Sequence, residues 1–123
     1  RHRGIEVIVT DHHQPGKDLP QAVAIINPGR RDSSYPFREL AGVGVAFKLV
    51  QALEMRTKSS NMWEHLDLVA LGTIADVVPL TGENRILVKY GLQELSQTRK
   101  PGLQALIEVS RIRGKQLTST QVG

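Results

Sequence analysis

The chain has 123 residues, of which 40% are hydrophobic and 23% charged, and it contains no cysteine. This size and composition predict at most one soluble globular domain and exclude disulfide bonds and thiolate metal sites, so any metal must be held by His, Asp or Glu. The net charge of +4 permits a nucleic-acid partner without requiring one. No apolar stretch approaches the roughly 20 residues of a membrane span, and we expect no membrane partner and a cytoplasmic location.

Two short apolar runs near the N-terminus predict strands. Residues 5–10, IEVIVT, form a β-branched run typical of a strand that is buried on both faces of a parallel sheet. Residues 22–27, AVAIIN, end at Pro28-Gly29 and predict a second strand. A sheet of only two strands leaves edges exposed, so we expect further strands before residue 1.

The rest of the chain is predicted to be mostly helical. Apolar residues recur at helical spacing, and Asn61, Thr81 and Pro101 provide start signals, with Glu64 completing a capping-box-like start after Asn61. The expected helices cover residues 39–56, 61–78, 82–97 and 101–112, with the start of a further helix at 117–123. The predicted fold class is therefore α/β, with a parallel sheet flanked by helices and two N-terminal strands.

An acid and two adjacent histidines, Asp11, His12 and His13, directly follow the first predicted strand. In parallel α/β sheets, ligands gather just beyond the carboxyl ends of the strands. Imidazole and carboxylate suit Mn²⁺ and similar ions, while a histidine that is not on a metal can donate a proton or hydrogen bond to a phosphate. Neighbouring side chains leave a strand in different directions, so one histidine can face a metal and the other a substrate. An Asx-type turn with two solvated histidines explains these residues equally well.

Asp76, in the apolar segment GTIADVVPL, is a second candidate. We expect its carboxylate to be buried, where it must be paired, hydrogen-bonded or on a metal to offset the lost hydration. The alternative is a residue at a helix C-terminus or turn that accepts backbone hydrogen bonds.

Four segments together resemble the DHH phosphoesterase family: VIVTDHH, YPFRELAGVGVAFKL, LDLVALGTIADVVPLTGENRILVKYGL and LTSTQVG. Within that family the chain is most similar to exonucleases that degrade single-stranded DNA from 5′ to 3′ in DNA repair and recombination. The resemblance implies that residues 1–123 are part of a DHH-type catalytic domain. It places an Asp-x-Asp motif and a metal-bridging aspartate before Arg1, and a DHH-associated, DNA-binding domain after Gly123.

The resemblance also implies a role for each candidate residue. His12 and Asp76 are expected to bind the same one of two catalytic ions, Mn²⁺ or Mg²⁺. His13 is expected to contact the scissile phosphate, and Asp11 to orient a histidine. The implied chemistry is two-metal phosphodiester hydrolysis. Because two ligands cannot hold a two-metal site, we expect residues 1–123 alone to bind Mn²⁺ weakly and to lack nuclease activity.

Two other functions remain open at this point. One is a DHH phosphoesterase for small molecules or short oligonucleotides, such as a pyrophosphatase; the other is a non-catalytic DHH scaffold. The segment ADVVPLTGENR favours the exonuclease over the small-molecule enzyme. The sequence contains all four candidate site residues, Asp11, His12, His13 and Asp76, which argues against a non-catalytic scaffold.

Three arginines are candidate DNA contacts. Arg30 and Arg31 lie in a loop after Pro28-Gly29, and Arg85 follows Asn84 at the start of a predicted helix. Structural roles are at least as common as contact with DNA for residues of this kind. Loop arginines are often solvated, and the structural alternatives are a surface ion pair for Arg85 and a helix-start role for Asn84.

The remaining features favour structural interpretations. Trp63 and Tyr90 lie at helical spacing with leucines and are expected in the core rather than as base-stacking platforms. Aromatic residues are only 4% of the chain and offer little for a stacking groove. The segment AGVGVAF resembles half of a dinucleotide-binding fingerprint, but close helix packing explains its glycines better. His2 and His65 are expected at the surface.

Overall fold

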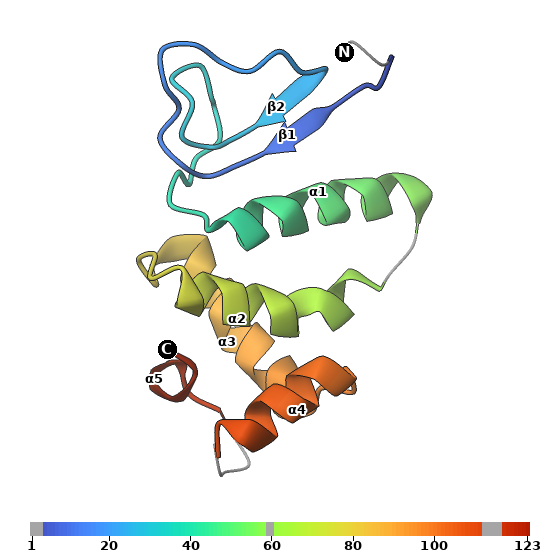
Figure 1. Cartoon of the computed structure of the whole chain (residues 1–123), viewed down its shortest axis with the longest axis vertical. Helices are drawn as coiled ribbons and strands as arrows, with labels where there is room; N and C mark the ends of the chain where they lie inside the picture. Colours follow the sequence, from blue (N-terminus) through green and yellow to red (C-terminus); the bar gives the residue numbers. More distant parts are fainter. Residues whose placement is uncertain (1–3, 59–60, 112–116) are drawn as a thin grey trace.

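A computed structural model of the chain describes residues 4–58, 61–111 and 117–123. A small sheet, a long helix, a pair of packed helices and two shorter helices follow one another along the longest axis of the molecule (Figure 1). The elements are β1 (Ile8–Thr10), β2 (Ala24–Ile26), α1 (Gly42–Thr57), the 3₁₀-helix η1 (Met62–His65), α2 (Leu66–Ala75), α3 (Gly82–Ser96), α4 (Pro101–Val109) and α5 (Ser119–Val122).

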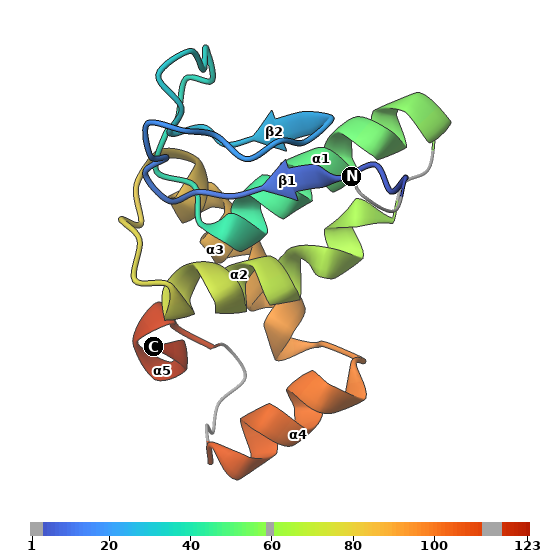
Figure 2. The same cartoon turned by 45° about the horizontal axis from the view of Figure 1, so that its top comes forward.

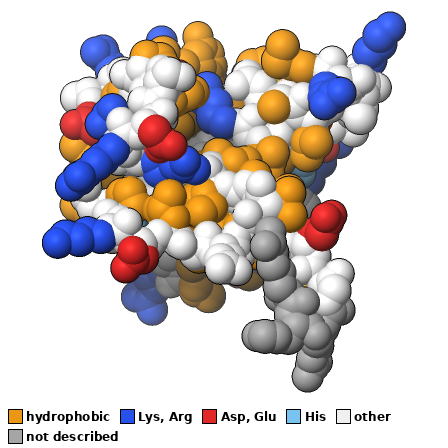
Figure 3. Space-filling view, turned by 90° about the horizontal axis from the view of Figure 1, so that it is seen from above, with side chains coloured by type: hydrophobic (Ala, Val, Ile, Leu, Met, Phe, Trp, Pro, Cys, Tyr) orange, Lys and Arg blue, Asp and Glu red, His pale blue; other side chains and the backbone are white. Residues whose placement is uncertain are grey.

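The two strands pair in parallel, with Ile8 opposite Ala24 and Thr10 opposite Ile26, as the fold-class prediction requires. Each strand has only three residues and is shorter than predicted. The expected burial of the first strand on both faces is wrong, because Ile8 is 57% exposed and Ile5 and Val7 are also exposed. Helix α1 lies along one side of the sheet (Figures 1 and 2), whereas hydrophobic side chains lie open at the sheet end of the molecule (Figure 3).

Helices α2 and α3 pack closely against each other. A Cβ atom added at Gly91 of α3 would collide with the carbonyl oxygen of Leu66 at the start of α2, so only glycine lets the two backbones approach this closely. This contact pairs the second half of α3 with the beginning of α2, so the helices run antiparallel. The main core packs around this pair and α1: Leu40, Val45, Phe47, Leu66, Val69 and Leu87.

The helix ends differ from the sequence predictions in several places, and α1 begins at Gly42 rather than at residue 39. The expected helix over residues 61–78 is divided into η1 and α2, and α2 ends at Ala75. Asn61 makes no side-chain capping bond, because its backbone (φ −95°, ψ 0°) is already helical rather than extended. Thr81 precedes α3 in an extended conformation but also makes no capping bond, and its hydroxyl donates instead to Glu39 at 3.2 Å.

A buried ion pair ties the turn before α4 to α2. The Asp67 carboxylate is only 2% exposed and receives Lys100 Nζ at 2.7 Å and Thr98 Oγ1 at 2.7 Å. Burial raises the pKa of Asp67, but the hydrogen bonds from Lys100 and Thr98 outweigh burial and leave the pKa below its usual value.

The prediction that Trp63 and Tyr90 lie in the core is wrong, since their exposures are 56% and 50%. Trp63 is on η1, before the buried face of α2 begins at Leu66, and Tyr90 lies on α3 beside Gly91, which takes the contact with α2. His65 is exposed, as expected, and His2 lies outside the described residues. None of the helices in the described ranges has the length and apolar character needed to cross a membrane.

Candidate metal centre

The carboxyl ends of β1 and β2 are joined by polar contacts that position the histidine pair. The Asp11 backbone N–H donates to the carbonyl of Ile26 at 3.0 Å, extending the strand pairing by one bond. The Asn27 side chain donates to the carbonyl of His13 at 2.8 Å and accepts from the Gly29 N–H at 2.8 Å. Asn27 was not predicted as a site residue, although an asparagine between a strand and Pro28-Gly29 is a recognisable turn signal.

The Asp11 carboxylate orients the residues that follow it. One of its oxygens accepts the backbone N–H groups of His12 and His13 at 2.7 and 3.2 Å and lies 2.7 Å from Nδ1 of His13. These bonds, led by the one from the His13 ring, lower the pKa of Asp11 to about 2, and the same carboxylate raises the pKa of His13. When Nδ1 donates to Asp11, Nε2 is left to meet another group.

The two histidine side chains have different environments. The His13 side chain is 76% exposed, whereas that of His12 is 17% exposed. The rings are neighbours, with their centroids 4.3 Å apart and their planes tilted by 49°. The Asx-type turn is therefore present, but only one of the two histidines is solvated.

His12 lies against the first turn of α1. A Cβ atom added at Gly42 would lie 3.2 Å from Cδ2 of the His12 ring, so this glycine leaves room for the imidazole. At Gly44 the corresponding neighbour is Leu40, also at 3.2 Å. The glycines of AGVGVAF therefore permit close packing, but against His12 and Leu40 rather than against another helix.

Asp76 approaches the Nε2 atom of His12. Its Oδ2 lies 3.3 Å from His12 Nε2, within the range expected of two ligands for one ion. The prediction that Asp76 is buried is wrong, because its side chain is 36% exposed. Asp76 caps the C-terminus of α2, and Val77 has a left-handed backbone (φ 55°) that turns the chain away from the core. The predicted alternative, a residue at a helix C-terminus, describes its location.

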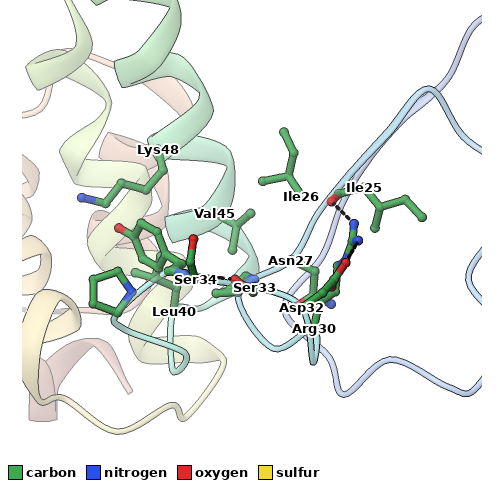
Figure 4. Close-up of a pocket in the computed structure, with 13 residues that line it drawn as sticks. Ile25, Ile26, Asn27, Arg30, Asp32, Ser33, Ser34, Leu40, Val45 and Lys48 are labelled. Carbon is green, nitrogen blue, oxygen red and sulfur yellow. Dashed lines mark hydrogen bonds and ion pairs between the residues drawn. The ribbon is translucent and has the colours of Figure 1, made fainter.

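The arginines do not gather around this centre in a common arrangement. Arg30 donates to both oxygens of Asp32, at 2.9 and 2.6 Å, and to the carbonyl of Ile25 at 2.8 Å, so its guanidinium is engaged (Figure 4). Arg31 and Arg85 are exposed. Contact of these arginines with DNA stays a prediction.

Asn84 has a structural role in this fold. Its side chain is fully buried and donates to the carbonyls of Glu39 and Pro79 at 2.6 and 3.0 Å. It therefore fixes the start of α3 against the segment before α1 and cannot reach a phosphate.

A cavity of about 480 Å³ lies between β2, the following loop and α1 (Figure 4). Its charged lining is largely neutralised, because Arg30 pairs with Asp32, and Lys48 Nζ lies 3.0 Å from Glu83. Tyr35 also donates to Glu83, and burial together with this bond raises the pKa of Tyr35 to about 12. The cavity is lined by neither histidine of the pair.

The donor set fits a divalent ion in part. His12 Nε2 and Asp76 Oδ2 face each other, and one ligand atom from each of Asp11, His12 and His13 lies within 4.8 Å of the others. A nitrogen and oxygen set of this kind suits Mn²⁺, which takes about six ligands. The described residues, 4–58, 61–111 and 117–123, therefore provide part of the ligand set that a divalent ion needs.

Comparison with known proteins identifies the class. Residues 1–73 match the DHH family, N-terminal domain, and the chain belongs to this family. A strand end that carries an acid and two histidines beside a second carboxylate is the arrangement that the family resemblance predicted.

The similar proteins within the family are exonucleases. The chain is 47% identical to the single-stranded-DNA-specific exonuclease RecJ of Escherichia coli K12, over all of this chain and 23% of that protein. It is 51% identical to RecJ of Bacillus subtilis 168, over 87% of this chain and 13% of that protein. The chain thus spans about a quarter or less of the length of these relatives.

Two crystal structures share the fold. One, of exonuclease RecJ bound to manganese, is 42% identical and superposes with a TM-score of 0.82 over 97% of this chain and 29% of that chain. The other, of RecJ in complex with Mn²⁺ from Thermus thermophilus, is 41% identical, with a TM-score of 0.83 over 98% of this chain and 18% of that chain. The α/β fold class, mostly helical after two strands, is confirmed.

Proposed function

We propose that this chain forms part of the catalytic domain of an exonuclease that hydrolyses single-stranded DNA from the 5′ end in DNA repair and recombination. The observation that carries the proposal is the 3.3 Å approach of His12 Nε2 to Asp76 Oδ2, which joins two segments far apart in the sequence. The names of the relatives and the manganese in the two similar crystal structures support the substrate and the metal.

In this proposal His12 and Asp76 hold one of two divalent ions, with the remaining ligands supplied by a preceding segment of the catalytic domain. Gly42 leaves space for the His12 ring, and Asp76, at the C-terminus of α2, places its carboxylate 3.3 Å from that ring. Divalent ions, when bound, supply charge that stabilises the phosphate oxygens and activates water for attack on phosphorus.

His13 is proposed to contact the scissile phosphate. Asp11 raises the pKa of His13, which favours the cationic imidazolium and its attraction to an anionic phosphate. Asp11 also fixes the ring through Nδ1, while Asn27 holds the His13 backbone carbonyl. The exposed edge of the ring is thereby presented to a substrate without rotating freely.

Manganese binding to residues 1–123 tests the metal pair. We expect weak binding in an electron paramagnetic resonance titration, and a further loss of affinity of about tenfold or more in Asp76→Asn or His12→Ala, since each removes a ligand. Asp18→Asn, in an exposed loop, is the matched control and is expected to bind as the parent chain does. Unchanged manganese affinity in both site variants would contradict the assignment.

Substrate choice tests the reaction. An enzyme with the complete catalytic domain is expected to release nucleotides from the 5′ end of a single-stranded oligonucleotide in the presence of Mn²⁺. Duplex DNA and inorganic pyrophosphate are the comparison substrates. Hydrolysis of pyrophosphate in preference to the oligonucleotide would favour the small-molecule phosphoesterase instead.

A further inference from the structure

The outer face of α3 carries two neighbouring rows of exposed side chains. Ile86 and Tyr90, four residues apart, form an apolar row, and both are at least half exposed. Arg85 and Lys89, also four residues apart, form a cationic row beside it. The opposite face of α3 is used for packing, because Gly91 contacts the start of α2.

Trp63 extends the apolar row across to η1. Trp63 and Tyr90 line a common hollow of about 500 Å³ together with Leu66, Gln93 and Glu94. Two large aromatic side chains that share one open hollow form a larger continuous apolar surface than exposed residues that are scattered singly. Glu94 is the acidic member of this lining, and Gln93 offers an amide that can donate or accept.

A cation accompanies the aromatic pair. Lys89 Nζ lies 5.6 Å from the centroid of the Tyr90 ring, and Arg85 lies one helical turn nearer the start of α3. Proteins that bind single strands without sequence preference combine aromatic rings, on which bases stack, with cations that follow the phosphates. An apolar protein segment would offer no anionic partner to Arg85 and Lys89.

We propose that Trp63, Tyr90, Lys89 and Arg85 form a base-stacking subsite for single-stranded nucleic acid, separate from the metal centre. Because α2 and α3 run antiparallel, the start of α3 lies at the end of α2 that carries Asp76, and Trp63 lies toward the other end. A strand bound along α3 would therefore run from the region of the metal centre toward Trp63. The ligand class is that of the proposed function, but binding at this subsite requires neither metal nor hydrolysis.

Tryptophan fluorescence tests the subsite directly, because Trp63 is the single tryptophan of the chain. Residues 1–123 are titrated with an oligothymidylate in EDTA, and with an abasic oligonucleotide of the same length. We expect the thymidylate to quench the fluorescence and to bind about five- to 100-fold more tightly than the abasic strand, the scale of one stacked base. Equal binding of the two strands, or no quenching at low salt, would overturn the proposal.

Variants separate stacking from charge. Tyr90→Ala is expected to remove most of the preference for the thymidylate, and Lys89→Ala to weaken both strands alike and reduce the salt dependence. Lys17→Ala, on an exposed loop, is the control for charge and is expected to change affinity by less than about twofold. Circular dichroism verifies that each variant is folded. Retained base preference in folded Tyr90→Ala contradicts the subsite. Because EDTA removes the metal, a failure of nuclease activity and a failure of this subsite are distinguishable.

Discussion

The sheet end of the molecule is held together by strand pairing and polar side chains, whereas the helical end combines a hydrophobic core with a close backbone contact and a buried ion pair. At the sheet end, Asp11 and Asn27 each collect several hydrogen bonds around strands of three residues. At the helical end, Gly91 brings α3 onto α2, and Lys100 neutralises Asp67. The side chains that position the site are therefore not the ones that contribute most to the stability of the fold.

Replacement of Gly91 should cause the largest loss of stability, because it disrupts the packing of α2 against α3. In Gly91→Ala the new Cβ collides with the Leu66 carbonyl oxygen, a backbone atom that cannot move aside without separating the helices. We expect a loss of about 3 kcal/mol or more in the free energy of unfolding, measured by urea denaturation. Gly102→Ala is the control, because nothing lies within 4 Å of its Cβ position, and it should be close to neutral. Equal stability of the two variants would contradict the contact.

Removal of Lys100 should come next. Lys100→Met leaves the Asp67 carboxylate buried without its cation, and we expect a loss of about 3 kcal/mol at pH 7 in the same urea assay. Lys17→Met is the control on an exposed loop. The Leu68 backbone N–H also donates to the Asp67 carboxylate, at 2.7 Å. An unchanged midpoint for Lys100→Met would show that this bond and the one from Thr98 suffice to stabilise the carboxylate.

The ion pair between Asp67 and Lys100 also makes the free energy of unfolding depend on pH. The folded-state pKa of Asp67 lies below its unfolded value of about 3.9, so the ion pair contributes its full stabilisation above that pH and loses it as the pH falls through the folded-state pKa. The stability difference between the parent chain and Lys100→Met should therefore narrow in acid. A constant difference from pH 7 to the acid transition would exclude this linkage.

Substitutions at the histidine pair should leave stability nearly intact and change activity instead. In an enzyme with the complete catalytic domain, His13→Ala is expected to lower kcat about 100-fold, the scale for losing one charged or proton-donating group, with no recovery in excess Mn²⁺. His12→Ala is expected to recover part of its rate in excess Mn²⁺, because mass action refills a weakened site. Identical rescue curves for the two variants would reject this division of roles.

The smallest effect is expected at Val77, in the turn between α2 and α3. A β-branched residue in the left-handed region is strained by roughly 1–2 kcal/mol, and the Val77 side chain is almost fully exposed, so it contributes little packing. Val77→Gly should therefore raise the thermal midpoint by a few degrees. Val109→Gly, at an exposed valine in helix α4, should lower it slightly. A lower midpoint for Val77→Gly would show that this backbone is not strained.

The order and type of the helices and strands could be predicted because hydrophobic periodicity and the turn and capping residues between elements are local signals in the sequence. Parallel pairing of two β-branched runs and the helical spacing after residue 40 were both recognisable in this way. The closeness of His12 to Asp76 followed from family resemblance, since nothing local links residues so far apart.

Other features depend on contacts that no local pattern contains. Trp63 and Tyr90 have helical spacing with leucines, but spacing does not say which face of a helix meets a neighbour, and the contact at Gly91 decided it. Asp76 has apolar neighbours in sequence, yet α2 ends just before it, so its carboxylate leaves the core. Asn27 acts across the sheet on His13, a pairing that only the fold creates.

The bond from Arg30 to the Ile25 carbonyl has a consequence for how the sheet can grow. The Ile26 carbonyl points toward β1, where it accepts the Asp11 N–H, so by alternation the Ile25 carbonyl points to the other edge of β2, and Arg30 occupies it there. A further strand would have to displace a guanidinium that Asp32 also holds. That edge is thereby protected against strand addition and aggregation, which leaves the β1 edge as the side on which another strand can pair.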